Sequence, residues 1–253
     1  MVPNTFFINL KRHYNPFADY APPDISLIEA FFNFNKEGFD IHNAIESLIK
    51  FNTFQEELDH ADKILFTLSI ALEAKDLYTK EHSMRVSKLS SDFVAFIGFP
   101  QIDCEEVSKA GVLHDIGKIF LSNSLLRKPD MLTEEESEVI QKHVVFGEEI
   151  CKPFFSMKKI LPAIRNHHER WDGSGFPDRL AGEDIPFVAR VLAIVDSFDA
   201  MVSERCYRGC QSIKSVLEAM KSEQRKGQWD PELLGYFVEM MSSIDNQIYN
   251  SNG

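Results

Sequence analysis

A histidine and an aspartate stand side by side in the middle of the chain, within the run Leu113-His-Asp-Ile-Gly-Lys118. Neutral imidazole and carboxylate are suitable ligands for divalent iron, manganese, nickel or zinc, and the two oxygens of Asp115 could bridge two ions. If the helix continues past this pair, Lys118 lies on the same side as His114, where its ammonium could meet an anion. An adjacent His and Asp is a weak signal by itself, because such pairs occur by chance in many chains.

Further histidines and a second aspartate strengthen this interpretation. His82, His143, His167 and His168 each lie within or at the edge of an expected helix, beside apolar residues typical of a core. Asp196 follows the apolar run that begins at Val191. A buried carboxylate without a partner costs several kcal/mol or takes up a proton, so Asp196 requires a cation or strong hydrogen bonds.

The composition is typical of a globular protein: 44% of the 253 residues are hydrophobic. This length supports one main core, and we expect a small helical extension at residues 1–55 and a main domain at 56–253. The net charge of −12 argues against a general binder of nucleic-acid polymers, which needs a basic surface. No apolar run approaches the ~20 residues that span a bilayer. No secretory signal is evident, so we expect a cytoplasmic protein with reduced thiols and no membrane contact.

Apolar residues recur at steps of three and four along most of the chain, which is typical of helices. The expected helices include 52–74, 102–117, 134–150, 160–170, 187–203, 212–221 and 231–241. No series of alternating strands is present, so the expected fold class is all-α, with many helices. The apolar stripe of 52–74 favours packing on the chain's own core, and a coiled coil that forms a homodimer is the alternative. The irregular loop 171–186 is long enough to favour a functional role.

The motifs, taken in order, resemble the HD superfamily of metal-dependent phosphohydrolases, and more closely its HD-GYP family, which hydrolyses the bacterial messenger cyclic di-GMP. The resemblance extends over roughly residues 72–237 and is specific because many short matches occur in one order. Besides the His114-Asp115 run, the matching strings are Asp76-Leu-Tyr-Thr-Lys-Glu-His-Ser-Met-Arg-Val86, Lys128-Pro-Asp-Met-Leu-Thr133, His167-His-Glu-Arg-Trp-Asp-Gly-Ser-Gly-Phe-Pro177, Asp196-Ser-Phe-Asp-Ala200 and Arg205-Cys-Tyr-Arg208.

The resemblance implies two divalent metal ions, with iron expected and manganese, nickel or zinc as alternatives. One ion would be held by His82, His114, Asp115 and Asp196, and the other by His143, His167, His168 and the bridging Asp115. Some family members hold a third metal through a glutamate at the position of Tyr78, so we expect two here.

The resemblance also implies a phosphodiesterase in which the metals activate water for in-line attack on phosphorus. Lys118, Arg205 and Arg208 match positions that contact substrate phosphates in similar proteins and would stabilise the developing charge. Asp199 shares a helical face with Asp196 and could orient Lys118 or a metal-bound water. A solvated surface position for Asp199 is the alternative.

One departure from the family motif concerns substrate binding. The family is named for Gly-Tyr-Pro, whereas this chain has Gly175-Phe176-Pro177. Phe176 keeps a ring for packing or base stacking and lacks the phenol. An active enzyme with substrate binding weaker by roughly 1–3 kcal/mol is one hypothesis. A weak or inactive module that senses cyclic di-GMP or docks on diguanylate cyclase (GGDEF) domains is a second, and an HD hydrolase of another nucleotide is a third.

Overall fold

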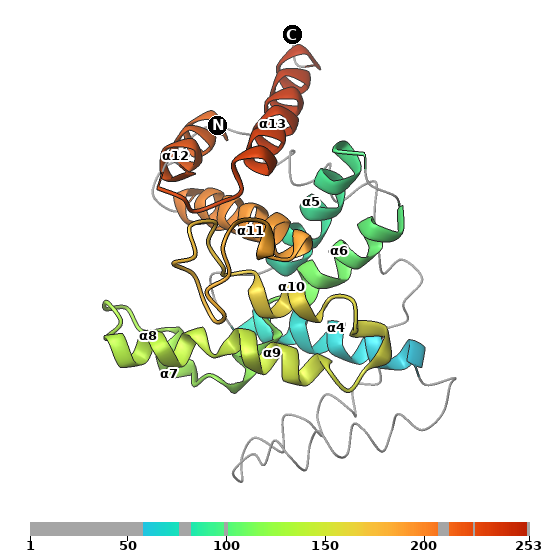
Figure 1. Ribbon diagram of the computed structural model, residues 1–253, viewed down its shortest axis with the longest axis vertical. Helices are drawn as coiled ribbons and strands as arrows, with labels where there is room; N and C mark the ends of the chain where they lie inside the picture. Colours follow the sequence, from blue (N-terminus) through green and yellow to red (C-terminus); the bar gives the residue numbers. More distant parts are fainter. Residues whose placement is uncertain (1–57, 76–81, 99–100, 207–212, 225, 252–253) are drawn as a thin grey trace.

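The computed structural model describes residues 58–75, 82–98, 101–206, 213–224 and 226–251. Within these ranges the chain forms helices and no strand, so the predicted all-α class is confirmed (Figure 1). None of the described helices is both long and apolar enough to cross a membrane. The predicted extension at 1–55, Tyr78 and Arg208 lie outside the described residues.

The described residues form ten α-helices and three short 3-10 helices. In chain order they are α4 (Leu58–Lys75), α5 (His82–Phe96), α6 (Gln101–Leu113), η2 (Ile116–Phe120), α7 (Asn123–Leu126), α8 (Glu134–Gln141), α9 (His143–Cys151), η3 (Phe155–Met157), α10 (Leu161–Asn166), η4 (Gly182–Asp184), α11 (Phe187–Cys206), α12 (Ile213–Gln224) and α13 (Pro231–Ser251). The most extensive pairing is between α5 and α6, and α9 packs against η2. Helix α11 crosses the middle of the molecule, between α12 and α13 above and α9 and α4 below (Figure 1).

The hydrophobic core joins α5, α11 and α13 through aromatic side chains. The ring of Phe237 lies 5.2 Å from that of Phe93 and 5.2 Å from that of Phe198, both edge to face. The indole N–H of Trp229 donates to the backbone oxygen of Ala193 over 3.0 Å. Such edge-to-face pairs contribute about 0.5–1.5 kcal/mol each beyond the area they bury. These contacts attach α13 to the helix that carries Asp196.

Two helix starts follow signals that are readable in the sequence. The side chain of Thr133 accepts from the N–H of Glu136, whose carboxylate accepts from the N–H of Thr133, so the predicted capping box begins α8. Asp230 accepts from two backbone N–H groups at the start of α13, at 2.9 and 3.1 Å. Helix α13, predicted to end at Met241, continues to Ser251.

Three helices that the sequence predicted as continuous are interrupted. The expected helices 102–117, 134–150 and 160–170 end or break after Leu113, Gln141 and Asn166. A histidine follows each break by one or two residues, and its Nδ1 atom lies 2.7–2.8 Å from the backbone oxygen three residues before it. The imidazole thereby bonds to a carbonyl in the last turn of the helix, where backbone partners run out. The predictions were wrong because apolar periodicity does not reveal this competition between side chain and backbone.

Gly117 allows η2 to approach α9 unusually closely. A Cβ atom at this position would lie 1.9 Å from the backbone oxygen of His143 and 2.5 Å from the nitrogen of Gly147. Only glycine fits such a contact. The approach brings the segment that follows Asp115 against the first turn of α9, which begins at His143.

The loop 171–186 is attached to the helices beside it. The N–H of Trp171 donates to the backbone oxygen of Gln228 over 3.2 Å, and the N–H of Asp178 donates to the Glu169 carboxylate over 2.7 Å. Arg165 of α10 forms two hydrogen bonds to the Asp178 carboxylate, at 2.7 and 2.8 Å. The loop is therefore fixed beside His167 and His168, which follow α10.

Candidate metal centre

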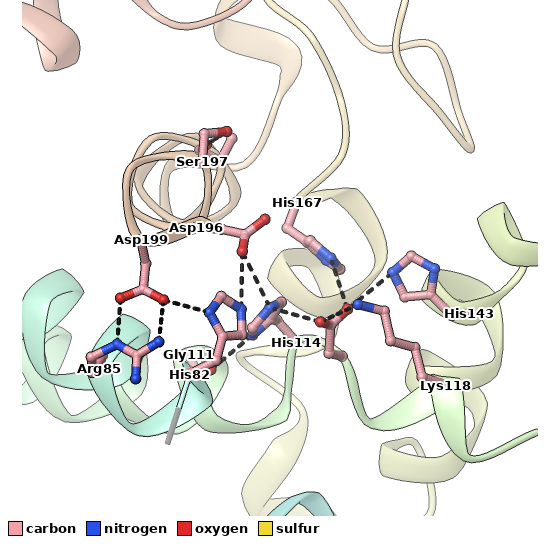
Figure 2. A network of polar contacts seen from close by, with 12 residues as sticks. His82, Arg85, Gly111, His114, Lys118, His143, His167, Asp196, Ser197 and Asp199 are labelled. Atoms are coloured by element: carbon pink, nitrogen blue, oxygen red, sulfur yellow. Dashed lines mark hydrogen bonds and ion pairs between the residues drawn. The ribbon is translucent and has the colours of Figure 1, made fainter. Parts of the chain in front are cut away.

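The side chains that the sequence predicted as metal ligands converge from distant parts of the chain. His82 begins α5, His114 and Asp115 follow α6, His143 begins α9, His167 and His168 follow α10, and Asp196 lies in α11. The potential ligand atoms of His143, His167, His168 and Asp115 lie within 4.8 Å of one another. Those of His82, His114 and Asp115 form a second such group. Figure 2 shows the imidazoles of His82, His114, His143 and His167 directed toward one centre.

Asp115 belongs to both groups. Its Oδ2 atom lies 3.3 Å from Nε2 of His114, and its Oδ1 atom lies 3.3 Å from Nε2 of His143 and 4.0 Å from Nε2 of His167. The two carboxylate oxygens thus face different groups. This arrangement could place one carboxylate between two cations.

The tautomers of three imidazoles follow from their hydrogen bonds. Nδ1 of His114, His143 and His167 lies 2.8, 2.7 and 2.8 Å from the backbone oxygens of Gly111, Ile140 and Ile164. A carbonyl oxygen can only accept, so Nδ1 carries the proton in each neutral ring. The lone pair is then on Nε2, which faces the centre.

The donor atoms at the centre fit divalent metal ions. Nε2 of His114, His143 and His167 and Oδ1 of Asp115 are buried and form no hydrogen bond with any described residue. Each such atom costs about 1–3 kcal/mol when left without a partner. Divalent cations at the two groups would satisfy these atoms, and imidazole with carboxylate suits iron, manganese, nickel and zinc. The clusters could therefore hold metals.

His82 lies between two carboxylates of α11. Its Nε2 atom is 3.1 Å from Oδ1 of Asp196, and its Nδ1 atom is 2.7 Å from Oδ2 of Asp199. Asp199 also pairs with Arg85, whose Nε lies 2.6 Å from Oδ1 (Figure 2). With 3% exposure Asp199 is not the solvated position given as the alternative. It contacts His82, and its proposed role in orienting Lys118 or a metal-bound water stays a prediction.

Sequence reasoning assigned no role to Arg85, although a signal was present. His82 and Arg85 are three residues apart on one helix, and Asp196 and Asp199 are three apart on another. This spacing places both members of each pair on one helical face, so two such helices can meet through four polar side chains.

Lys118 lies beside Asp115, but in a different structural element from the one predicted. Because α6 ends at Leu113, Lys118 lies in η2 instead of one turn further along the same helix. Its Nζ atom lies 2.5 Å from Oδ2 of Asp115. Burial alone would raise the pKa of Asp115, but the positive charge of Lys118 and that of His114 hold it well below its usual range.

Two histidines that follow α10 and two that lie near α11 have opposite pKa shifts. Burial lowers the pKa of His168 to about 4 and holds that of His167 well below its usual range, with help from neighbouring imidazoles. Burial also disfavours the charged form of His82, but hydrogen bonds to Asp196 and Asp199 outweigh it and raise its pKa to about 10. The pKa of His114 is likewise raised, because Asp115 and Asp196 outweigh burial. His167 and His168 are thus neutral and ready to coordinate at neutral pH, whereas a metal at the other group must displace protons.

Phe176 lies against a ligand candidate. Its ring centroid is 5.0 Å from that of His168, with 33° between the planes, so the ring packs on the imidazole from the loop side. Arg205 lies in the last turn of α11, with its side chain outside the described residues, as is all of Arg208.

Comparison with known proteins gives one family match. Residues 67–233 match the model of the HD domain. The chain is 35% identical over 193 residues to a cyclic di-GMP phosphodiesterase of Thermotoga maritima, covering 76% of this chain and 52% of the relative. It is 32% identical over 181 residues to the 3'3'-cGAMP-specific phosphodiesterase 2 of Vibrio cholerae, covering 70% of this chain and 34% of the relative. The chain therefore spans about half the length of the first relative and a third of the second.

A solved structure has the same fold. Bd1817, an HDG"Y"P protein from Bdellovibrio bacteriovorus, aligns with a TM-score of 0.55 at 16% identity, covering 78% of this chain and 68% of that protein. At this identity the match supports the arrangement of helices alone.

Proposed function

The chain belongs to the HD-domain family, and from this premise we propose that it is a metal-dependent phosphodiesterase that hydrolyses cyclic di-GMP to a linear dinucleotide or GMP. The observation that carries the proposal is the pair of His/Asp groups that share Asp115. Their buried atoms without partners match the donors that two divalent cations require.

In this proposal each cation has its own set of ligands. His82, His114, Asp115 and Asp196 hold one ion, and His143, His167, His168 and Asp115 hold the other. Iron is the first expectation, with manganese, nickel and zinc as alternatives. When bound, such ions lower the pKa of water and stabilise negative charge on phosphoryl oxygens.

The protein's own groups position the substrate and balance its charge. Lys118 places an ammonium beside Asp115, which helps a chain of net charge −12 to accept a phosphate diester. In the proposal Arg205 and Arg208 also bind the substrate phosphates. The ring of Phe176 supports His168 and offers an apolar face to a substrate base. The near-complete burial of His114, His143 and His167 limits access of bulk water.

Cyclic GMP-AMP is a second candidate substrate, because the Vibrio cholerae relative is specific for 3'3'-cGAMP. The two cyclic dinucleotides share the phosphodiester ring and differ in one base. The chemistry of cleavage is therefore the same for both, and base contacts decide between them. Docking on diguanylate cyclase domains, a homodimer and a cytoplasmic location stay predictions.

A module that binds cyclic di-GMP without cleaving it is the alternative from another functional class. Phe176 in place of tyrosine is the observation that favours it. A degenerate module would bind the nucleotide tightly and leave it intact even when both metal positions are filled.

The test is a substrate panel. Protein loaded anaerobically with Fe(II) or Mn(II) is incubated with cyclic di-GMP, 3'3'-cGAMP and cyclic di-AMP, and products are separated by chromatography. We expect hydrolysis of cyclic di-GMP, and faster cleavage of 3'3'-cGAMP would select the second candidate. Binding without turnover by fully loaded protein would select the non-catalytic module. The His143→Ala variant is the matched control for metal-dependent cleavage.

A further inference from the structure

His82 differs from the three other histidines whose Nδ1 partner is described. Those three donate to a neutral carbonyl three residues earlier in their own segment. His82 instead pairs with the carboxylate of Asp199, 117 positions away on another helix. The orientation of this imidazole therefore depends on the packing of α5 against α11, whereas the other three are held locally.

Asp199 is itself fixed and charged. Arg85 donates to Oδ1 from Nε over 2.6 Å and to Oδ2 from a terminal nitrogen over 2.8 Å, and that nitrogen also lies 3.1 Å from the hydroxyl of Ser203. The side chain of Asp199 is 4% exposed. A bidentate pair of this kind restrains the carboxylate in both position and angle.

The two aspartates of α11 enclose the His82 ring. Asp196 lies at Nε2, 3.1 Å away, and Asp199 lies at Nδ1, 2.7 Å away. A carboxylate at Nδ1 keeps the proton there, directs Nε2 to the centre and makes Nε2 more basic. Removing such a partner typically weakens metal binding 10–100-fold.

We propose that Asp199 and Arg85 are positioning residues that set the metal affinity of the His82 group alone. The inference rests on the proposed function, because it presupposes a metal at that group. In the group of His143, His167, His168 and Asp115, local backbone contacts hold the two imidazoles whose Nδ1 partners are described. In the other group, the orientation of His82 depends on the contact between α5 and α11. A change in the packing of α5 against α11 should therefore alter the affinity of the metal position that includes His82 and leave that of the other position unchanged.

The experiment compares Asp199→Asn and Arg85→Gln with the unmodified chain. Asp199→Asn keeps the size of the side chain and removes its charge. The control is Asp230→Asn, which removes the charge from another well-shielded Arg–Asp pair, formed with Arg190 over 2.7 Å. Mn(II) is titrated anaerobically into each protein, free and coupled Mn(II) are followed by electron paramagnetic resonance, and bound metal is counted by elemental analysis.

We expect the unmodified chain and Asp230→Asn to bind two ions with the same affinities. In Asp199→Asn one affinity falls about 10–100-fold and the other stays within about twofold, so the signal of coupled ions gives way to that of a single ion. Arg85→Gln shows a smaller loss at the same position. Adding His167→Ala to Asp199→Asn identifies the ion that is left, because the second substitution removes it.

Two results would overturn the inference alone. One is a pair of unchanged affinities in both variants. The other is equal weakening of both ions together with a loss of thermal stability matched by Asp230→Asn, which would indicate a purely structural pair. Absence of metal from the unmodified chain would overturn the proposed function, and the inference with it.

Discussion

Oδ1 of Asp115 lies 3.3 Å from Nε2 of His143, although the two residues belong to different segments. The contact exists because η2 packs on α9 with Gly117 at the closest point, where a Cβ atom would lie 1.9 Å from the backbone oxygen of His143. The glycine after the His-Asp pair therefore determines how the shared carboxylate meets the second group of histidines.

Gly117→Ala should destabilise the protein and move the Asp115 carboxylate away from the imidazole of His143. Overpacking of this kind costs about 1–3 kcal/mol, which corresponds to a fall in Tm of roughly 2–12 °C for a chain of this size. Thermal unfolding followed by circular dichroism measures it. Gly235→Ala is the control, because a Cβ atom in this part of α13 meets nothing within 4 Å and should be neutral or stabilising. Equal Tm values for both variants would show that the contact at Gly117 is not tight.

Lys118→Met should preserve the metal ions and impair catalysis. Removing the ammonium leaves the imidazole and carboxylate ligands in place but takes away positive charge where the substrate phosphate binds. We expect two bound ions and kcat/KM lower by about 100-fold, the usual scale for one charge-stabilising group. Elemental analysis and steady-state kinetics on the same sample separate the two effects. A variant that lost its metals but kept its activity per bound metal would assign Lys118 to the metal ligands instead.

Phe176→Tyr should change the rate of cyclic di-GMP cleavage little, whereas Phe176→Ala should lower it. The structure shows the ring against His168 at 5.0 Å, a contact that tyrosine retains and alanine removes. We expect Phe176→Tyr to cleave cyclic di-GMP within about threefold of the unmodified rate, since a gained hydrogen bond contributes modestly. Phe176→Ala should be about tenfold slower, because an aromatic pair contributes about 0.5–1.5 kcal/mol. Activity that appears only in Phe176→Tyr would instead support the non-catalytic module.

Cys151 should lower the stability of the protein in alkaline solution. Burial, with a smaller effect of Asp62, raises the pKa of this thiol from 9.0 to about 12. The folded state therefore holds the proton more tightly than the unfolded state. The resulting stability is complete below about pH 9 and is lost as the pH rises toward 12, by up to about 4 kcal/mol.

The comparison with Cys151→Ala isolates this effect from other titrating groups. Urea unfolding of both proteins at pH 8, 9, 10 and 11 should show the stability advantage of the unmodified chain shrinking at each step above pH 9. An advantage that is constant over this range would mean that the thiol ionises equally easily in both states.

The sequence predicted the chemistry of the centre better than its geometry. The resemblance to the HD-GYP family is confirmed by the family match and the relatives. Motif order identified the chemical class because His114-Asp115, His167-His168 and Asp196 are local strings that can be read without a structure. The all-α class followed from periodicity, which reports the apolar face of each helix.

The helix ends and the role of Asp199 could not be read in the same way. Three helices stop where an imidazole takes a backbone carbonyl, and this depends on where the ring is directed. The bond between His82 and Asp199 joins residues 117 positions apart, so no local pattern contains it. Lys118 was placed one helical turn after His114 on the condition that the helix continues, and this condition is not met because α6 ends at Leu113.

The most direct test of the proposed two-metal phosphodiesterase measures metal content and cleavage of cyclic di-GMP on one anaerobically loaded sample. We predict two ions per chain and steady turnover, and for Asp115→Asn at most one ion and no measurable turnover. Two ions per chain without any cleavage of the cyclic dinucleotide would contradict the account.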